Sequence, residues 1–300
     1  MKIITSHERA DMDALASIYG ASLLYPDHQA VLPTKLNRNL RDFVALYKDE
    51  LPFIERNRLE RRRISDLILV DTQSVPRMRG MDENTRRHII DHHDMEVTPS
   101  DRVTFEGDSV GATTTLLVEK IRHARVKLPP LGASLLLMGI YEDTGSLSYA
   151  TTTARDVEAA AWLLRHGADL QIVNEFLNRP LTDEQRDALA RLIRNATIQT
   201  IQKRSICVAA LELDRYVDEL STLIHEVMDI YEPDACFLLV RYQDSIQMIA
   251  RSMVDAIDVA GVLHAFGGGG HSKAAAALVQ ETSLADVQAR LLDLLERQIE

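Results

Sequence analysis

The sequence predicts an α/β protein with two domains, the first of which contains a mostly parallel sheet flanked by helices. Its 300 residues exceed a single domain of roughly 100–150 residues. Short β-rich runs alternate with helical patterns over the first two thirds of the chain, as in the βαβ units that build parallel sheets. A different pattern follows. We therefore expect a first domain over residues 1–180, a helical linker over 181–202, and a smaller α/β domain with a mixed sheet over 203–300.

The elements of the first domain follow from short apolar runs and from helical periodicity. The expected strands are Met1–Thr5, Asp66–Asp71 and His88–Asp91. The expected helices are Asp13–Leu24, Gly111–His123, Leu131–Tyr141 and Arg155–Gly167. The glycine at the end of the last helix suits a C-cap. Parallel sheets of this kind bind ligands at the carboxyl ends of their strands, near the point where the strand order reverses.

The second domain is expected to begin after a long helix over Thr182–Ile201, which opens with Thr182 as its N-cap and an acidic first turn. Two β-rich runs, Ala235–Tyr242 and Ser245–Ser252, flank Gln243 and Asp244 and predict an antiparallel hairpin. The other expected elements are the strands Arg204–Leu213 and Lys273–Val279, the helices Val217–Ile230 and Ala256–Phe266, and a terminal helix from Ala285.

The charge balance narrows the class of ligand. The chain has 45 acidic and 34 basic residues, which gives a net charge of −11. A protein that binds long nucleic acid nonspecifically normally presents a basic face. We therefore expect a short RNA or a small nucleotide as the ligand, and not long duplex DNA. The basic run Arg61–Arg63 is interpreted as a solvated surface that precedes a strand.

Cysteine usage and hydropathy predict a cytoplasmic protein without a membrane partner. Cys207 and Cys236 are isolated residues without CxxC spacing, and we interpret both as small buried side chains. The N-terminal stretch MKIITSHERADMD lacks the apolar core of a signal peptide. No run approaches the roughly 20 apolar residues of a membrane span.

Residues that can bind metal ions gather in four clusters, most of them after expected strands. The clusters are His7-x-x-x-Asp11-x-Asp13, Asp71, Asp91-His92-His93-Asp94 and Glu142-Asp143-Thr144-Gly145. Each alone is a weak signal, because an Asp at such a position is more often a helix cap, and Asp13 could cap the helix that starts there. Together they are informative, since carboxylates packed at one sheet edge repel one another unless cations offset their charge.

The ligand types indicate which metal to expect. Carboxylate oxygens with a minority of imidazole nitrogens suit Mn²⁺, with Mg²⁺ as the alternative and Zn²⁺ or Fe²⁺ less suitable. The lack of clustered Cys argues against a structural zinc site. Two such cations about 3.5–4 Å apart can activate a water and stabilise both oxygens of an in-line displacement at phosphorus. The spacing thus suggests bound metal ions, with Mn²⁺ as the expected metal, and a pair of them would permit hydrolysis of a phosphoester.

The order of these motifs, closing with GGGGH at Gly267–His271, resembles the DHH/DHHA1 phosphoesterase superfamily over nearly the whole chain. The resemblance implies six metal ligands, with Asp71 bridging the two ions: His7, Asp11, Asp13, Asp71, His92 and Asp143. It also implies a catalytic group made of Asp71, of His93 facing the scissile phosphate, and of Asp91 orienting an imidazole. The alternative for Asp91 is a plain hydrogen-bonded buried residue.

The second domain resembles the DHHA1 substrate domain, so an active-site cleft between the two domains is expected. Its implied substrate-binding residues are Arg251, Gly268, Gly269, Gly270 and His271, together with His93. Consecutive glycines let the backbone approach a ligand and offer N–H groups to phosphate, and Arg251 could bind a phosphate in bidentate fashion. The family pattern GGGHxxAAG is broken at Ala276, which puts close backbone contact there in doubt.

The superfamily leaves several functions open. The leading hypothesis is a nanoRNase-like hydrolase of short oligoribonucleotides or of 3′-phosphoadenosine 5′-phosphate. The alternatives are a cyclic di-AMP or pApA phosphodiesterase, a pyrophosphatase or exopolyphosphatase with Arg251 and Lys273 at the phosphates, and a nucleotide-binding regulatory module without catalysis. The stretch Leu32–Glu50 also resembles DHH modules fused to CBS and tRNA nucleotidyltransferase domains, which would make the chain an excised module. A homodimer is expected because dimers are common among relatives.

Overall fold

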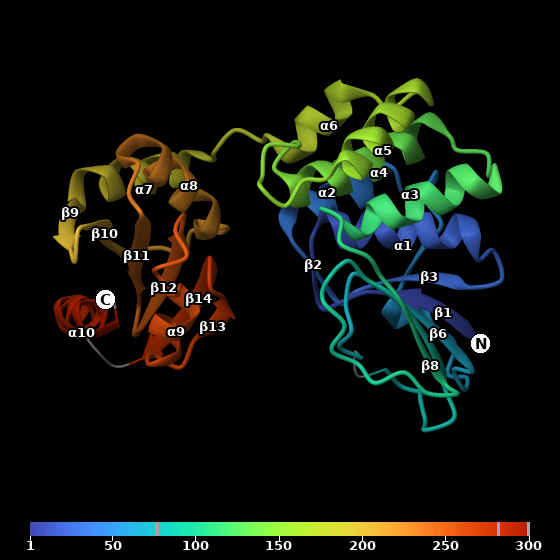
Figure 1. Cartoon of the computed structure of the whole chain (residues 1–300), viewed down its shortest axis with the longest axis horizontal. Helices are drawn as coiled ribbons and strands as arrows, with labels where there is room; N and C mark the ends of the chain where they lie inside the picture. Colours follow the sequence, from blue (N-terminus) through green and yellow to red (C-terminus); the bar gives the residue numbers. More distant parts are fainter. Residues whose placement is uncertain (76–77, 281–282, 299–300) are drawn as a thin grey trace. The chain divides into compact units, whose positions relative to one another are not determined.

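The computed structural model describes residues 1–75, 78–280 and 283–298. The chain divides into two compact units, Met1–Arg179 (unit 1) and Pro180–Glu300 (unit 2) (Figure 1). Among the described residues, no helix combines the length and the apolar character that a membrane crossing requires.

The centre of unit 1 is a six-stranded sheet in which all neighbouring strands are parallel. The strand order is β5-β3-β1-β6-β7-β8. The chain starts in the middle at β1, adds strands on one side, and then returns to place β6 on the other side of β1. The strand order therefore reverses between β1 and β6, which is where such sheets bind ligands. The strands are β1 Lys2–Thr5, β3 Gln29–Leu32, β5 Phe53–Glu55, β6 Asp66–Val70, β7 Arg86–Ile90 and β8 Val103–Glu106.

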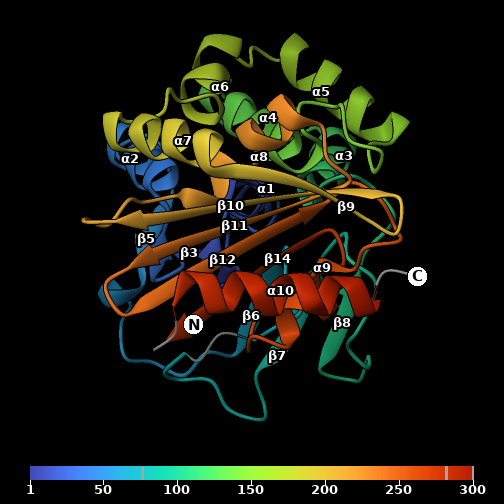
Figure 2. The same ribbon diagram turned by 90° about the vertical axis from the view of Figure 1, so that its left-hand side faces the viewer.

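The helices of unit 1 gather on one face of this sheet (Figures 1 and 2). They are α1 Met12–Leu24, α2 Arg38–Leu46, α3 Thr113–Ala124, α4 Pro130–Thr144, α5 Ala154–Arg165 and α6 Leu170–Leu177. Side chains of connecting segments, among them Leu59, Met78 and Val97, pack on Leu67 and Leu69 at the other face. The expected sheet is confirmed, but the α-helices among the described residues of unit 1 lie on one of its faces, and the connecting segments cover the other.

Unit 2 contains a second six-stranded sheet, of mixed direction, in the order β13-β14-β12-β11-β10-β9. Its strands are β9 Ala196–Ile201, β10 Arg204–Leu213, β11 Ala235–Tyr242, β12 Ser245–Ser252, β13 Gly269–His271 and β14 Ala274–Gln280. Only β10 and β11 are parallel, and the expected hairpin of β11 and β12 is confirmed. The helices are α7 Asp183–Asn195, α8 Leu220–Tyr231, α9 Val259–His264 and α10 Leu284–Gln298, and two separate apolar cores cover the two faces of the sheet (Figure 2).

The expected helical linker is partly a strand. Helix α7 ends at Asn195, and residues 196–201 form β9, which pairs antiparallel with β10. The β-branched residues of this stretch favour an extended backbone, and the edge of β10 supplies hydrogen-bond partners that a helix extension would forgo. Helix α7 also buries Ala188 and Leu192 in a core of unit 2. The segment therefore belongs to unit 2 and does not link the units as a free helix.

Candidate metal centre

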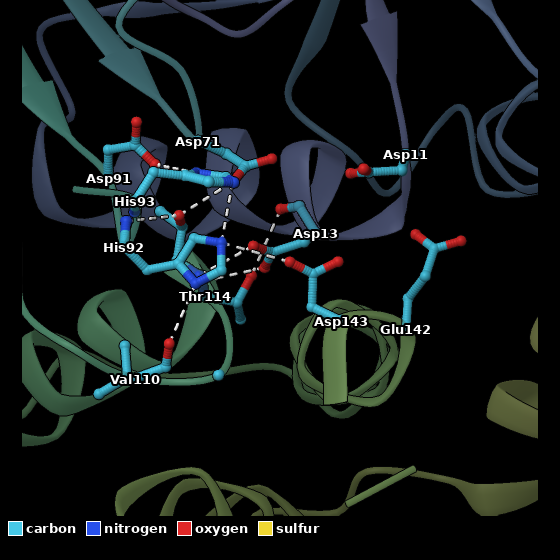
Figure 3. A network of polar contacts seen from close by, with 12 residues as sticks. Asp11, Asp13, Asp71, Asp91, His92, His93, Val110, Thr114, Glu142 and Asp143 are labelled. Carbon is cyan, nitrogen blue, oxygen red and sulfur yellow. Dashed lines mark hydrogen bonds and ion pairs between the residues drawn. The ribbon is translucent and has the colours of Figure 1, made fainter. Parts of the chain in front are cut away.

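Three adjacent strands bring most of the predicted ligands to one edge of the sheet of unit 1. His7, Asp11 and Asp13 follow β1, Asp71 follows β6, and His92 follows β7. Asp143 arrives differently. It lies in the last turn of α4, which ends at Thr144, and not after a strand. Helix α4 contacts both α1 and α3, so its C-terminal turn reaches the same place. Figure 3 shows Asp13, Asp71, His92 and Asp143 gathered around one place.

Asp71 is common to three groups of possible ligand atoms among the described residues, and two of these groups consist of predicted metal ligands alone. One group combines it with His7 and Asp11, and the other with Asp13, His92 and Asp143; within each group the ligand atoms lie within 4.8 Å of one another. Its Oδ2 lies 3.5 Å from His7 Nε2, and its Oδ1 lies 3.9 Å from His92 Nε2. The two oxygens of one carboxylate therefore face the two groups, as a bridging ligand requires.

The backbone at Asp71 is itself unusual. The residue has φ of +55°, in the left-handed region that non-glycine residues seldom adopt, and its side chain is nearly completely buried. The Asp71 N–H donates to Ile90 O at 3.0 Å, which ties the end of β6 to the end of β7. Strained backbone of this kind costs free energy and persists where the surroundings hold it in place. Here it turns the chain out of β6 directly at the shared carboxylate.

Asp11 and Asp13 differ in their hydrogen bonds, which decides which of them caps helix α1. Asp11 is the N-cap of α1, and its Oδ1 accepts from Ala14 N at 2.9 Å, so the alternative that Asp13 caps this helix is wrong. Asp13 is fully buried in the first turn. Its two oxygens accept from Thr113 N at 2.8 Å and from Thr114 N at 3.0 Å, at the start of α3. These donors fix the direction of the Asp13 carboxylate.

His92 has the hydrogen-bonding state of a metal ligand. Its Nδ1 lies 3.0 Å from Val110 O, and because a carbonyl can only accept, Nδ1 carries a proton, which leaves Nε2 as the atom that can bind a metal ion in the neutral ring. Nε2 is buried and has no hydrogen-bond partner among the described residues, although Asp143 Oδ2 lies 3.4 Å away. A metal-bound histidine commonly donates its other N–H to a carbonyl in this way. The orphaned Nε2 and the surrounding carboxylates thus fit a divalent cation.

The electrostatics of the cluster point the same way. Burial, followed by the charges of Asp13 and Asp11, raises the pKa of Asp143 to about 9. Burial raises the pKa of Asp13 to about 6, and burial with the neighbouring carboxylates raises that of Asp71 well above its usual value. The cluster therefore retains protons at neutral pH unless cations offset its charge. Carboxylate and imidazole donors of this kind suit Mn²⁺ or Mg²⁺.

His93 and Asp91 form a hydrogen-bonded pair, and both also offer ligand atoms that lie within 4.8 Å of those of Asp71 and His92. Asp91 is buried, and its Oδ1 accepts from His93 Nδ1 at 2.7 Å and from His93 N at 3.2 Å. This hydrogen bond raises the pKa of His93. Burial alone would raise the pKa of Asp91, but the bond and charge of His93 lower it overall. About half of the His93 side chain is exposed, so its Nε2 is left to contact a ligand.

Thr113 is the most informative residue that the sequence reasoning missed. Its Oγ1 donates to Asp71 Oδ1 at 3.0 Å and accepts from His92 N at 3.2 Å, while its own N–H donates to Asp13. One threonine thus positions three predicted ligands from three segments of the chain. The only sequence signal is the run Gly111-Ala-Thr-Thr-Thr at the start of an expected helix.

Two acidic residues support the same region. Glu142 accepts from Met12 N at the start of α1, and burial, followed by the charge of Asp11, raises its pKa to about 8. Asp156 is fully buried and accepts from Gly111 N at 2.9 Å, from Thr115 Oγ1 at 2.6 Å and from both N and Oγ1 of Thr153 at 2.7 Å. Asp156 therefore holds the starts of α3 and α5 together.

The predicted substrate-binding residues of unit 2 lie at one edge of its sheet. Arg251 on β12 and His271 on β13 both pair with Ala274 on β14, so the three side chains share a row on one face. We call Arg251, His271 and Gly268–Gly270 the β12–β13 edge. A Cβ at Gly268 would lie 2.4 Å from Ala276 O, and one at Gly270 2.3 Å from Ala274 O. These glycines are thus required for the close packing of the turn on β14.

The sequence of this chain is similar to a known family and to several curated proteins. Residues 2–140 match the DHH family, N-terminal domain. The chain is 36% identical over 98% of its length to an A-adding tRNA nucleotidyltransferase from Geobacter sulfurreducens, and covers 34% of that protein. It is 28% identical to the bifunctional oligoribonuclease and PAP phosphatase NrnA from Mycoplasma genitalium over 63% of this chain and 59% of that protein. The chain thus spans about a third of the length of the first relative and more than half of the second.

Solved structures show the same fold. An exopolyphosphatase-related protein from Bacteroides fragilis superposes with a TM-score of 0.79 at 16% identity, over 98% of this chain and 91% of that one. RecJ from Thermus thermophilus, in complex with Mn²⁺, superposes with a TM-score of 0.52 at 14% identity, over 99% of this chain and 52% of that one. These structures show the fold alone. The match of residues 2–140 to the DHH family and the similarity to NrnA, together with the motif order, show that the chain belongs to the DHH superfamily.

Proposed function

We propose that this chain is a two-metal phosphoesterase that hydrolyses short oligoribonucleotides or small nucleotides such as 3′-phosphoadenosine 5′-phosphate. The observation that carries the proposal is the shared carboxylate of Asp71, which belongs to two groups of predicted ligand atoms at the point where the strand order reverses. The similarity to NrnA, an oligoribonuclease and PAP phosphatase, supports this choice of substrate.

Six residues would hold the two ions: His7, Asp11, Asp13, Asp71, His92 and Asp143. When bound, two divalent cations supply a water of lowered pKa as the nucleophile and stabilise charge at phosphorus. We propose Mn²⁺, with Mg²⁺ as the alternative, on the basis of the oxygen and imidazole donors. The presence of Mn²⁺ in RecJ, which has a similar fold, is consistent with this choice.

The pair of Asp91 and His93 has a distinct role in this proposal. Asp91 accepts from Nδ1 and so fixes the ring of His93, and it favours the protonated imidazole by raising its pKa. A protonated Nε2 could then donate to a phosphoryl oxygen or to the leaving oxygen of the substrate. We therefore assign His93 to contact with the scissile phosphate and Asp91 to its orientation.

Unit 2 is proposed to act as a DHHA1-type substrate domain. Arg251 and His271, which share a row on the sheet, would bind a phosphate or base of the substrate away from the reacting phosphorus. The exposed backbone of Gly269 and Gly270 would offer N–H groups beside them. The proposed substrate is accordingly a few nucleotides long, and the acidic net charge of −11 disfavours long duplex DNA as a substrate.

The test is a substrate panel with Mn²⁺ present. It contains short oligoribonucleotides, matching oligodeoxynucleotides, pApA, cyclic di-AMP, 3′-phosphoadenosine 5′-phosphate and pyrophosphate, and the release of nucleotides and phosphate is measured. We expect turnover of the short RNAs and of the 3′-phosphonucleotide. Turnover of cyclic di-AMP or pyrophosphate alone would replace the proposed substrate but keep the metal site. A protein that hydrolyses no member of the panel would contradict the proposal.

A further inference from the structure

Unit 1 contains two adjoining hollows beyond the predicted ligands. The first, of about 570 Å³, lies between α2 and the edge strand β5, which Figure 2 shows at the same side of unit 1. The second, of about 880 Å³, is lined by the segment that follows β5 and by Met78–Asp82. They share Thr34, Arg56 and Asn57 in their linings. We refer to the two together as the basic hollow.

The lining carries positive charge that the protein does not itself neutralise. Eight cationic and three acidic side chains line the basic hollow, in a chain whose net charge is −11. The three acids are each paired with an arginine of the same lining: Glu55 with Arg58 at 3.5 Å, Glu60 with Arg62 at 2.7 Å and Asp82 with Arg63 at 2.9 Å.

Four further cations of the lining have no acidic partner within 4.0 Å among the residues that the structure describes. They are Arg41, Lys48, Arg61 and Arg79, and all four are exposed. Uncompensated cations that line a concave surface concentrate an anionic ligand there, because low-dielectric walls focus the field. The basic run at residues 61–63, which is interpreted from the sequence as a solvated surface, thus lines a hollow that contains these unpaired cations.

The first hollow also offers an apolar surface. Leu32, Leu36, Val44, Phe53 and Ile54 contribute to its lining, beside the cations Arg41 and Lys48. Its volume falls in the range of roughly 300–1,000 Å³ that is typical of small-molecule sites. A ligand that places a flat apolar group on this surface and a negative charge on its rim matches both features, and a nucleotide has that composition.

The basic hollow borders the loop that carries the predicted ligands. Glu8 follows His7 directly, and its carboxylate accepts from Arg56 and, at 3.2 Å, from Thr34 N, two residues that line both hollows. The short strands Arg9–Ala10 (β2) and Lys35–Leu36 (β4) pair in parallel and join the same two loops again. A nucleotide in the basic hollow would therefore contact lining residues that are hydrogen-bonded to the segment from which His7 and Asp11 project.

We propose that the basic hollow is a second nucleotide-binding site, in which the apolar surface takes a base and Arg41 and Lys48 take its phosphate. The ligand is a nucleotide, either free or as part of a single-stranded oligoribonucleotide whose further phosphates contact Arg61 and Arg79. The proposal deepens the proposed function, on which it rests for the link to hydrolysis, by placing part of the RNA on unit 1.

The test measures binding without turnover. The full chain is kept in EDTA, which removes the metal that hydrolysis requires, and the probes are fluorescently labelled pentaadenylate and labelled AMP, followed by anisotropy. The variants are Arg41→Ala/Lys48→Ala and Arg61→Ala/Arg79→Ala. The matched control is Arg122→Ala/Lys127→Ala, which removes the same charge from exposed positions elsewhere on unit 1. Circular dichroism checks that each variant is folded.

We expect Arg41→Ala/Lys48→Ala to weaken pentaadenylate binding at 50 mM salt by about tenfold or more, and to reduce the slope of log K against log salt by about 1.4. The control should bind as the unchanged protein does. If Arg61→Ala/Arg79→Ala also weakens the binding of pentaadenylate, the basic hollow binds a single strand. If AMP binding alone is lost, and only in Arg41→Ala/Lys48→Ala, the basic hollow binds a free nucleotide.

Equal effects of the control and the test variants, or no effect of either, would overturn the proposal. So would variants that keep nucleotide binding but lose binding to phosphatidylserine vesicles, since the hollow would then face a lipid surface. Because binding is measured in the absence of metal, a chain that fails to hydrolyse the substrate panel can still bind nucleotide here. The two proposals therefore fail separately.

Discussion

The metal centre of unit 1 and the β12–β13 edge of unit 2 carry predicted functional residues in opposite ways. At the metal centre, carboxylates that repel one another are buried and held by backbone N–H groups and by Thr113. At the β12–β13 edge, Arg251 is half-buried and His271 is exposed, and Gly268 and Gly270 are needed for packing on β14. In the first region, buried carboxylates repel one another and a bound cation would reduce that repulsion, as a catalytic metal site requires. The second region presents accessible side chains, as substrate binding requires.

The largest effect that we expect is a loss of turnover when the candidate metal centre is altered. Asp71→Asn removes the charge shared by the two groups of ligand atoms, so turnover should fall by at least the roughly 10²–10³-fold that loss of one transition-state contact costs. Phosphate release with Mn²⁺ measures it. The control is Asp101→Asn, at an exposed position of unit 1. Undiminished turnover in Asp71→Asn would mean that this carboxylate does not take part in the chemistry.

A smaller effect tests how the metal centre is held. Thr113→Val keeps the shape of the side chain but removes the hydroxyl that donates to Asp71. We expect metal affinity or activity to fall about 10–100-fold, as for other residues that orient metal ligands. Isothermal titration with Mn²⁺ measures the affinity. Thr113→Ser retains the hydroxyl and should behave as the unchanged protein; equal losses in both variants would point to helix packing as the cause.

At the β12–β13 edge, the comparison predicts an effect on binding alone. Arg251→Ala should raise KM about tenfold or more, the equivalent of one charge-assisted hydrogen bond of roughly 1.5–3 kcal/mol, with kcat nearly unchanged. Arg194→Ala, an exposed arginine on α7, is the control. Steady-state kinetics on a short oligoribonucleotide separates the two constants. A fall in kcat at constant KM would place Arg251 among the residues that contact the reacting phosphate.

The smallest effect that we expect is a change with pH in the thermal stability of the metal-free protein. The carboxyl pKa values are raised in the folded protein, to about 6 for Asp13, 8 for Glu142 and 9 for Asp143. The metal-free folded state therefore binds protons more tightly than the unfolded chain does, and this contribution to stability is lost as the pH rises through these values. The Tm of the metal-free protein should fall from pH 5 to pH 9.

Added Mn²⁺ should oppose this loss. At hundredfold excess over its Kd it should raise the Tm of unit 1 by about 5–10 °C at pH 8. The gain should be smaller at pH 6, because protons compete with the metal for the same oxygens. Calorimetry at both pH values measures this. A Tm gain that is equal at pH 6 and pH 8 would show that Mn²⁺ does not displace these protons.

Local pattern was sufficient where neighbouring residues alone determine the element. The runs Arg204–Leu213, Ala235–Tyr242 and Ser245–Ser252 have the predicted bounds, because each is a run rich in apolar residues and a two-residue turn separates the last two. The prediction was wrong where pairing with another strand determines the secondary structure. Residues 196–201 continue the helical pattern of α7, but they form β9 because the edge of β10 offers hydrogen bonds.

The sequence by itself determined the ligand types and their order, since an Asp or His that follows an apolar run is visible without a structure. Only the tertiary structure decided how they meet. Asp71 is shared because β1 and β6 are neighbours although more than sixty residues separate them in the chain. Thr113 and the basic hollow were invisible for the same reason: their contacts join segments far apart in sequence, and those contacts exist only once the sheet has formed and the helices pack on it.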